Sequence, residues 1–185
     1  MMMKRFKRLM RSVAVAAALS AVALMGVAQA EEGTVKATAS WEGQGYAFPV
    51  GEDQVYMVAV YAGVMFVDDG KGSLDAASIV CPGTMDGNLA KGTKTGDGRC
   101  VITDRDGDRV FARFTCSGDL QGCRGPFTIV GGTGKFAGIT GEGEMISRIQ
   151  ARQLTMYAGV DDVQQQGAGL AIWPALHYKI PDTAK

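Results

Sequence analysis

The side chains best able to do chemistry in this chain lie within strand-like runs of alternating residues. Arg113 belongs to one such run, and Glu144 and Arg148 share one face of another, so each run carries a polar stripe. A stripe that points into a barrel must pair its charges or meet a polar ligand, whereas a stripe that points outward simply faces water. Tyr56 and Tyr61 lie on opposite faces of a long apolar run, so one hydroxyl can reach an interior cavity unless both rings belong to the core. These five residues are the candidate ligand-binding groups, and no catalytic residue is assigned.

Four cysteines are the next chemical signal. Cys116 and Cys123 flank a loop of six residues, and Cys81 and Cys100 flank a polar, glycine-rich segment of 18 residues. We predict these two local disulfides, although four cysteines allow other pairings. Residues 85–98 would then form a hairpin or a flap pinned at its base. The rival interpretation, a four-cysteine zinc site, lacks a Cys-x-x-Cys pair, and no metal is expected.

The segment Gly131-Gly-Thr-Gly-Lys-Phe136 has the composition of a phosphate-binding loop but not its spacing. A P-loop needs glycine where Ile129 stands and serine or threonine where Phe136 stands, and a dinucleotide fingerprint needs glycine in place of Ala137. A strand is expected to follow, so the helix N-terminus that would bind phosphate is missing. No nucleotide or other cofactor is expected.

Two further features could suggest a metal. An EF-hand loop beginning at Asp104 would place glycine at Arg109 and glutamate at Thr115, so Asp104-Arg-Asp-Gly-Asp108 predicts a hairpin turn with solvated carboxylates, with opportunistic calcium as the alternative. His177 is the single histidine, and no Gly-x-Ser-x-Gly elbow accompanies it. We predict a structural role for His177, with metal or haem ligation by it alone as the alternative.

Residues 1–30 have the features of an export signal. Five basic residues precede the apolar run 13–27, and Ala28-Gln-Ala30 is typical of a signal peptidase site. The run is shorter than the roughly 20 residues of a spanning helix, so we expect cleavage, no membrane insertion afterwards and a periplasmic or secreted protein; an uncleaved anchor is the alternative. The mature chain then has 14 Lys plus Arg against 19 Asp plus Glu, a net charge of −5. This charge argues against nucleic acid or an anionic membrane as a partner.

The elements that must position these groups are strands. Residues 100–145 predict three consecutive strands, because Asp-Gly and Gly-Gly between alternating β-branched and aromatic residues are typical of antiparallel hairpins. Pro174 predicts an edge or a bulge in the last strand. The other expected segments are strands over residues 34–42, 144–157 and 170–180, and loops over residues 44–53 and 159–169.

Phe-Thr-Ile-Val-Gly-Gly-Thr-Gly-Lys-Phe-Ala-Gly, residues 127–138, resembles the strand-turn-strand motif of allene oxide cyclase-like and dirigent-like barrels. The mature chain is also similar to uncharacterised bacterial exported proteins that share the Asp-Gly-Asp turn and four cysteines. The resemblance implies a barrel fold. No position matches the acidic, tyrosine and arginine residues that such enzymes use, so no catalytic residue is carried over.

The run Gln54–Val67 is the most hydrophobic element, and both of its faces are apolar. Its Val, Tyr and Phe content favours a long strand. In a barrel one face fills the interior, so the outer face needs a partner subunit or a terminal segment of the same chain to cover it. Coverage by a partner subunit predicts a homo-oligomer, and the resemblance implies a trimer.

Residues 31–185 are therefore expected to form one all-β domain, an antiparallel closed β-barrel of about eight strands. We expect it to bind a small, largely apolar molecule in the barrel. One alternative is a cofactor-free cyclase or isomerase that acts inside the barrel. The other is a structural or assembly protein whose barrel is filled by its own side chains.

Overall fold

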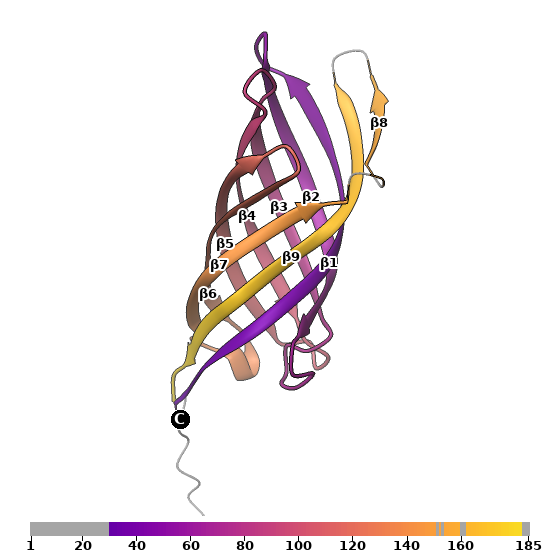
Figure 1. Ribbon diagram of the computed structural model, residues 1–185. Helices are drawn as coiled ribbons and strands as arrows, with labels where there is room; N and C mark the ends of the chain where they lie inside the picture. The colour runs from indigo at the N-terminus through magenta and orange to yellow at the C-terminus, as the bar shows by residue number, and fades with distance from the viewer. Residues whose placement is uncertain (1–29, 151, 153, 160–161, 183–185) are drawn as a thin grey trace, which may run out of the picture. The chain divides into compact units, whose positions relative to one another are not determined.

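The computed structural model describes residues 30–150, 152, 154–159 and 162–182; the predicted export signal lies outside them except for Ala30. The segment Ala30–Pro181 forms one compact unit, which is a β-barrel (Figure 1). Its strands are β1 Glu31–Pro49, β2 Gln54–Val67, β3 Ala77–Asn88, β4 Thr93–Thr103, β5 Arg109–Asp119, β6 Gly122–Gly132, β7 Thr140–Ile149, β8 Thr155–Ala158 and β9 Val163–Ile180, with a short 3-10 helix, η2 Gly134–Phe136. The described residues contain no helix long and apolar enough to cross a membrane.

The barrel closes through its longest strands. β1 to β7 pair in sequence order as antiparallel neighbours, and β9 lies between β7 and β1. These eight strands form the closed ring, and among the described strands β8 pairs with β9 alone, beside the upper part of β9 in Figure 1. The predicted fold class, an antiparallel closed β-barrel, is confirmed.

The predicted loop over residues 44–53 is wrong for most of its length. β1 continues to Pro49, and Tyr46 pairs with Val58 of β2 on one side and with Gln164 of β9 on the other. Gly45 permits the close approach, because a Cβ there would lie 2.5 Å from the Val58 carbonyl oxygen. Pairing with two neighbours overrides the turn-like composition, as is common in sheets.

Two predictions near the C-terminus are also wrong. The strand expected over residues 144–157 stops at Ile149, and its last residues belong to a separate strand, β8. The loop expected over residues 159–169 becomes strand from Val163 onward, because Val163 to Ala168 pair with β1. The polar composition of this segment resembles that of a loop, although its backbone groups are satisfied by β1.

Pro174 lies in a bulge, as the sequence predicts. β1 pairs Ala37 with Trp173 but Val35 with Leu176, so β9 holds one extra residue there. The same irregularity appears on the β7 side of β9. Since proline donates no ladder hydrogen bond, a bulge accommodates it. The extra residue turns both Trp173 and Leu176 inward, where each is 1% exposed.

The barrel is solid at one end. The largest fully buried side chains include Phe127 of β6, Trp173 of β9 and Ile102 of β4. The rings of Phe127 and Trp173 meet edge to face with centroids 5.2 Å apart. Phe136 of η2 is also buried in this core. This packed end forms the floor beneath the other half of the barrel.

Candidate functional site

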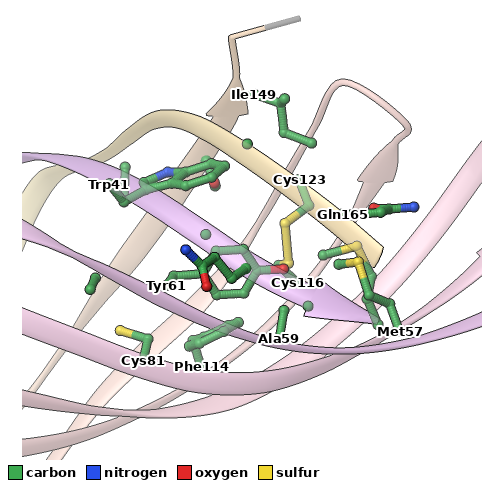
Figure 2. Close-up of a pocket in the computed structure, with 18 of the residues that line it drawn as sticks. Trp41, Met57, Ala59, Tyr61, Cys81, Phe114, Cys116, Cys123, Ile149 and Gln165 are labelled. Carbon is green, nitrogen blue, oxygen red and sulfur yellow. A yellow bond between two sulfur atoms is a disulfide. The ribbon is translucent and has the colours of Figure 1, made fainter. Parts of the chain in front are cut away.

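The half of the barrel away from the termini encloses a cavity of about 110 Å³. Its wall is mostly apolar and comes from all eight strands of the ring, including Trp41 of β1, Met57 of β2 and Phe114 of β5 (Figure 2). For scale, a cavity of about 150 Å³ lined by apolar side chains takes up benzene. The space is therefore sufficient for a small apolar group.

Tyr61 lies in this wall because β2 alternates its side chains. Met57, Ala59 and Tyr61 point inward, and the residues between them point outward. The Tyr61 ring meets the Trp41 ring edge to face, with centroids 5.3 Å apart (Figure 2). Burial raises the pKa of Tyr61 to about 12, so its hydroxyl remains a neutral donor and acceptor.

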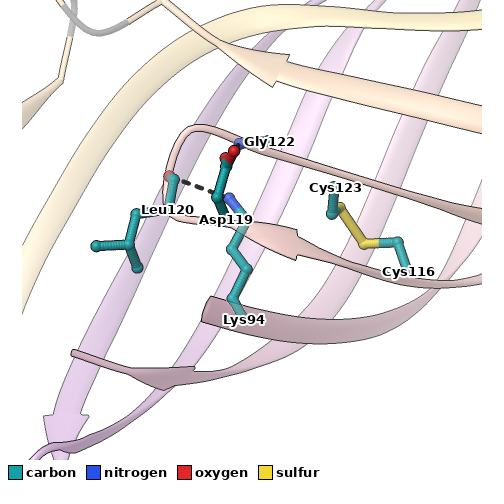
Figure 3. Close-up of a disulfide and its surroundings, with 6 residues drawn as sticks. All are labelled: Lys94, Cys116, Asp119, Leu120, Gly122 and Cys123. Carbon is teal, nitrogen blue, oxygen red and sulfur yellow. Dashed lines mark hydrogen bonds between the residues drawn. A yellow bond between two sulfur atoms is a disulfide. The ribbon is translucent and has the colours of Figure 1, made fainter. Parts of the chain in front are cut away.

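Lys94 is the cationic side chain of the cavity wall, and it is 6% exposed. It is the second residue of β4, close to the 89–92 turn, and it points inward. Its Nζ donates a hydrogen bond to the Leu120 carbonyl oxygen at 3.3 Å (Figure 3). Burial lowers the pKa of Lys94; Asp119 acts in the opposite direction, and Arg148 lowers the pKa further. No carboxylate of the described residues forms an ion pair with it.

The floor of the cavity supplies a further polar group. Trp173 lines the cavity, and its buried indole Nε1–H has no hydrogen-bond partner among the described residues. Buried donors of this kind are rare, since leaving one unpaired costs free energy. The wall therefore combines a large apolar area with a limited set of polar groups, which includes Tyr61, Lys94 and Trp173 and also Thr84, Ser147 and Gln165.

Both predicted disulfides are confirmed. Cys81 is bonded to Cys100 between β3 and β4, with Cα atoms 4.1 Å apart, and Cys116 to Cys123 between β5 and β6, with Cα atoms 5.5 Å apart. Three of the four cysteines line the cavity, so the bridges join neighbouring strands where the barrel is hollow. Two intact bridges are consistent with an oxidising compartment.

Of the five candidate ligand-binding residues, the structure brings only Tyr61 into the cavity. Tyr56 points outward from β2, and the side chains of Arg113, Glu144 and Arg148 are exposed on the outer face of β5 and β7. The strand alternation is the reason, because the residues beside them, such as Ala112 and Met145, fill the interior. The polar stripes therefore correspond to the water-facing alternative.

Comparison with known proteins finds no family model that matches this chain and no curated protein that matches it. The resemblance to allene oxide cyclase-like and dirigent-like barrels therefore stays a prediction.

Sequence reasoning missed Lys94, although a signal for it exists. On β4 the inward positions recur every second residue, so counting back from Cys100 leads through Gly98 and Gly96 to Lys94. The glycine-rich composition of residues 85–98 obscured this alternation. Of the two forms expected there, the structure has the hairpin, formed by β3 and β4.

The remaining motifs lie at the packed end. Asp104 is buried rather than solvated: its Oδ1 accepts hydrogen bonds from the backbone N–H groups of Asp106 and Asp108, and its Oδ2 pairs with Lys135 at 2.5 Å. Lys135 also binds Asp106, so the glycine-rich segment is joined to the turn. His177 Nδ1 lies 2.7 Å from the Thr34 hydroxyl oxygen across β1 and β9, in keeping with a structural role. Within the described residues, no group of His, Cys, Asp and Glu side chains could hold a metal ion.

Proposed function

We propose that this protein binds a small, largely apolar molecule inside the hollow half of its barrel. The observation that carries the proposal is the cavity of about 110 Å³, whose wall is apolar apart from a few polar groups. Binding sites for small molecules commonly combine an apolar lining with a small number of polar groups that orient the ligand. The packed core beneath the cavity gives it a rigid floor.

The two alternative functions have less support. A cyclase or isomerase needs acid–base groups beside its substrate, and the candidates are Arg113, Glu144, Arg148 or a tyrosine. Arg113, Glu144 and Arg148 lie on the outer face of the barrel. Tyr61 lines the cavity, but its raised pKa of about 12 makes it a poor proton donor at neutral pH. Among the described residues, no Asp or Glu lines the cavity. A purely structural barrel would be filled by its own side chains along its whole length, whereas here the filling is confined to the end near Trp173.

We further propose that the protein works in the periplasm or after secretion, as an oligomer. The export signal and two disulfides support the location. The outer face of β2 supports assembly, because Val58, Val60 and Phe66 are 47 to 50% exposed and lie on one side of the strand. A self-association surface of this composition follows the rule that large apolar patches mark interaction sites. A trimer is the expectation that the family resemblance provides.

Tryptophan fluorescence tests the binding proposal directly. The chain has two tryptophans, Trp41 and Trp173, and both line the cavity. Bromobenzene, a small apolar quencher, should therefore reduce the emission of the oxidised mature protein in a saturable way.

Two variants of adjacent β2 residues complete the test. Ala59→Phe fills the cavity and should abolish the saturable part of the quenching, whereas Val60→Phe, on the outer face, should leave it unchanged. Each variant is first checked for a cooperative thermal transition, because overpacking can destabilise a fold. Quenching that rises linearly without saturation, equally in all three proteins, would rule out the proposed site.

A further inference from the structure

The geometry points to a carboxylate at one end of the ligand: we propose that Lys94 binds an anionic carboxylate head group at the mouth of the cavity while an apolar tail enters it. This inference rests on the proposed function, and it specifies the class of ligand, a small monocarboxylate with a hydrocarbon tail. It is carried by the placement of Lys94, by the charges around it and by the size of the cavity.

The placement leaves the ammonium group incompletely paired. Lys94 is 6% exposed, yet within the described part of the chain its hydrogen bond goes to the neutral carbonyl of Leu120, at 3.3 Å. An ammonium group has three donors, and removing a charge from water is costly unless it is paired. Because Lys94 belongs to the cavity wall, a ligand carboxylate can supply both the missing charge and the missing acceptors.

The neighbouring charges favour an anion at this place. Two charged groups act on Lys94, the carboxylate of Asp119 and the guanidinium of Arg148. Asp119 is engaged in the β5–β6 turn, where its Oδ1 accepts hydrogen bonds from the backbone N–H groups of Gln121 and Gly122, both at 2.9 Å. Figure 3 shows Asp119 and Leu120 beside Lys94 at this turn. Asp119 is therefore held by the turn and forms no ion pair with Lys94, while Arg148 adds positive charge from the outer face of β7.

The cavity determines what the rest of the ligand can be. Lys94 lies near the turn at the open end of β4, and the wall below it is formed by apolar residues such as Met57, Met85 and Ala59. Compared with the cavity of about 150 Å³ that accepts benzene, the volume of about 110 Å³ suits a tail of about five carbon atoms. Hexanoate is therefore the natural probe, with its carboxylate at Lys94 and its chain inside.

The test compares hexanoate with 1-hexanol and hexylamine, which share the tail and differ in the head group. Binding to the oxidised mature protein is measured by calorimetry and by tryptophan emission. A hydrogen bond between charged partners predicts that hexanoate binds about ten- to hundredfold more tightly than 1-hexanol, and hexylamine more weakly than either.

Variants distinguish a specific effect of Lys94 from an effect of the protein's net charge. Lys94→Met should reduce the affinity for hexanoate to that for 1-hexanol and leave 1-hexanol binding unchanged, whereas Lys94→Arg should keep the preference for the carboxylate. Lys91→Met is the matched control, because Lys91 is an exposed residue of the adjacent 89–92 turn that does not line the cavity. It changes the net charge equally and should have no effect.

The pH dependence provides a readout that needs no variant. The pKa of Lys94 is lowered by burial, so the affinity for hexanoate should fall as pH rises toward the ordinary lysine range, while that for 1-hexanol stays constant. Equal binding of hexanoate and 1-hexanol, or a preference that survives in Lys94→Met, would overturn the carboxylate inference alone. Failure of all three probes and of bromobenzene to bind would instead overturn the proposed function.

Discussion

Replacing Lys94 by methionine should make the protein more stable, because the substitution keeps the length of the side chain and removes a buried charge. In the native state Lys94 has one hydrogen bond to a neutral carbonyl and no ion pair with a described residue. In the unfolded chain the same ammonium is fully hydrated. A methionine side chain in a wall lined by Met57 and Met85 pays no such desolvation cost and adds apolar contact.

The expected gain is on the order of 1 kcal/mol in the free energy of unfolding, since buried charges without partners are replaced favourably by apolar residues. For a domain of this size that corresponds to a rise of about 2–4 °C in the melting temperature. Urea unfolding of the oxidised mature protein, followed by tryptophan emission, measures it. Lys91→Met should stay within about 0.5 kcal/mol of the wild type, as exposed substitutions usually do.

The pH dependence of this gain has a defined sign. The native-state pKa of Lys94 is lowered, so the unfolded state binds more protons than the native state between that lowered pKa and the ordinary lysine value of about 10.4. The cost of burying Lys94 is therefore complete at neutral pH and diminishes as pH rises through this interval. The advantage of Lys94→Met should shrink accordingly. A less stable Lys94→Met with an unaffected Lys91→Met would refute the reasoning, because Lys94 would then be a stabilising residue.

Three further predictions follow from other parts of the barrel. Removing the Cys81–Cys100 bridge by paired alanine substitutions should destabilise the protein by about 3 kcal/mol and removing Cys116–Cys123 by slightly less, because the chain separations are 19 and 7 residues; denaturant unfolding of both variants tests this order. Lys135 lowers the pKa of Asp104, so the stability that this pair contributes is present above the ordinary carboxyl value of about 3.9 and is lost as pH falls below it; acid unfolding of Lys135→Met should show a weaker dependence in that interval. Val60→Lys places a charge on the exposed outer face of β2 and should reduce the oligomer to a smaller species in light scattering; a wild-type protein that is monomeric at micromolar concentration would refute the assembly proposal.

The sequence was a sufficient guide wherever a local rule decides the outcome. The Val, Tyr and Phe content identified β2 to the residue, turn chemistry located the hairpins, and Pro174 indicated the bulge. The errors arose where pairing with distant strands decides instead. Residues 163–168 are polar, yet they are strand because β1 satisfies their backbone groups. Closure of the barrel likewise decides which face of each strand points inward. The local sequence around Arg113 or Glu144 does not show on which face these side chains lie.

The disulfides and the cavity are connected physically. A barrel of eight strands normally derives its rigidity from the side chains that fill it, as the packed end around Phe127 and Trp173 does here. The hollow half has fewer contacts between opposite walls, so its strands would be the first to separate. Cys81, Cys116 and Cys123 line that half, and their bridges join β3 to β4 and β5 to β6. The covalent links thus replace part of the packing that the cavity removes, so that the space for a ligand persists without collapse of the wall.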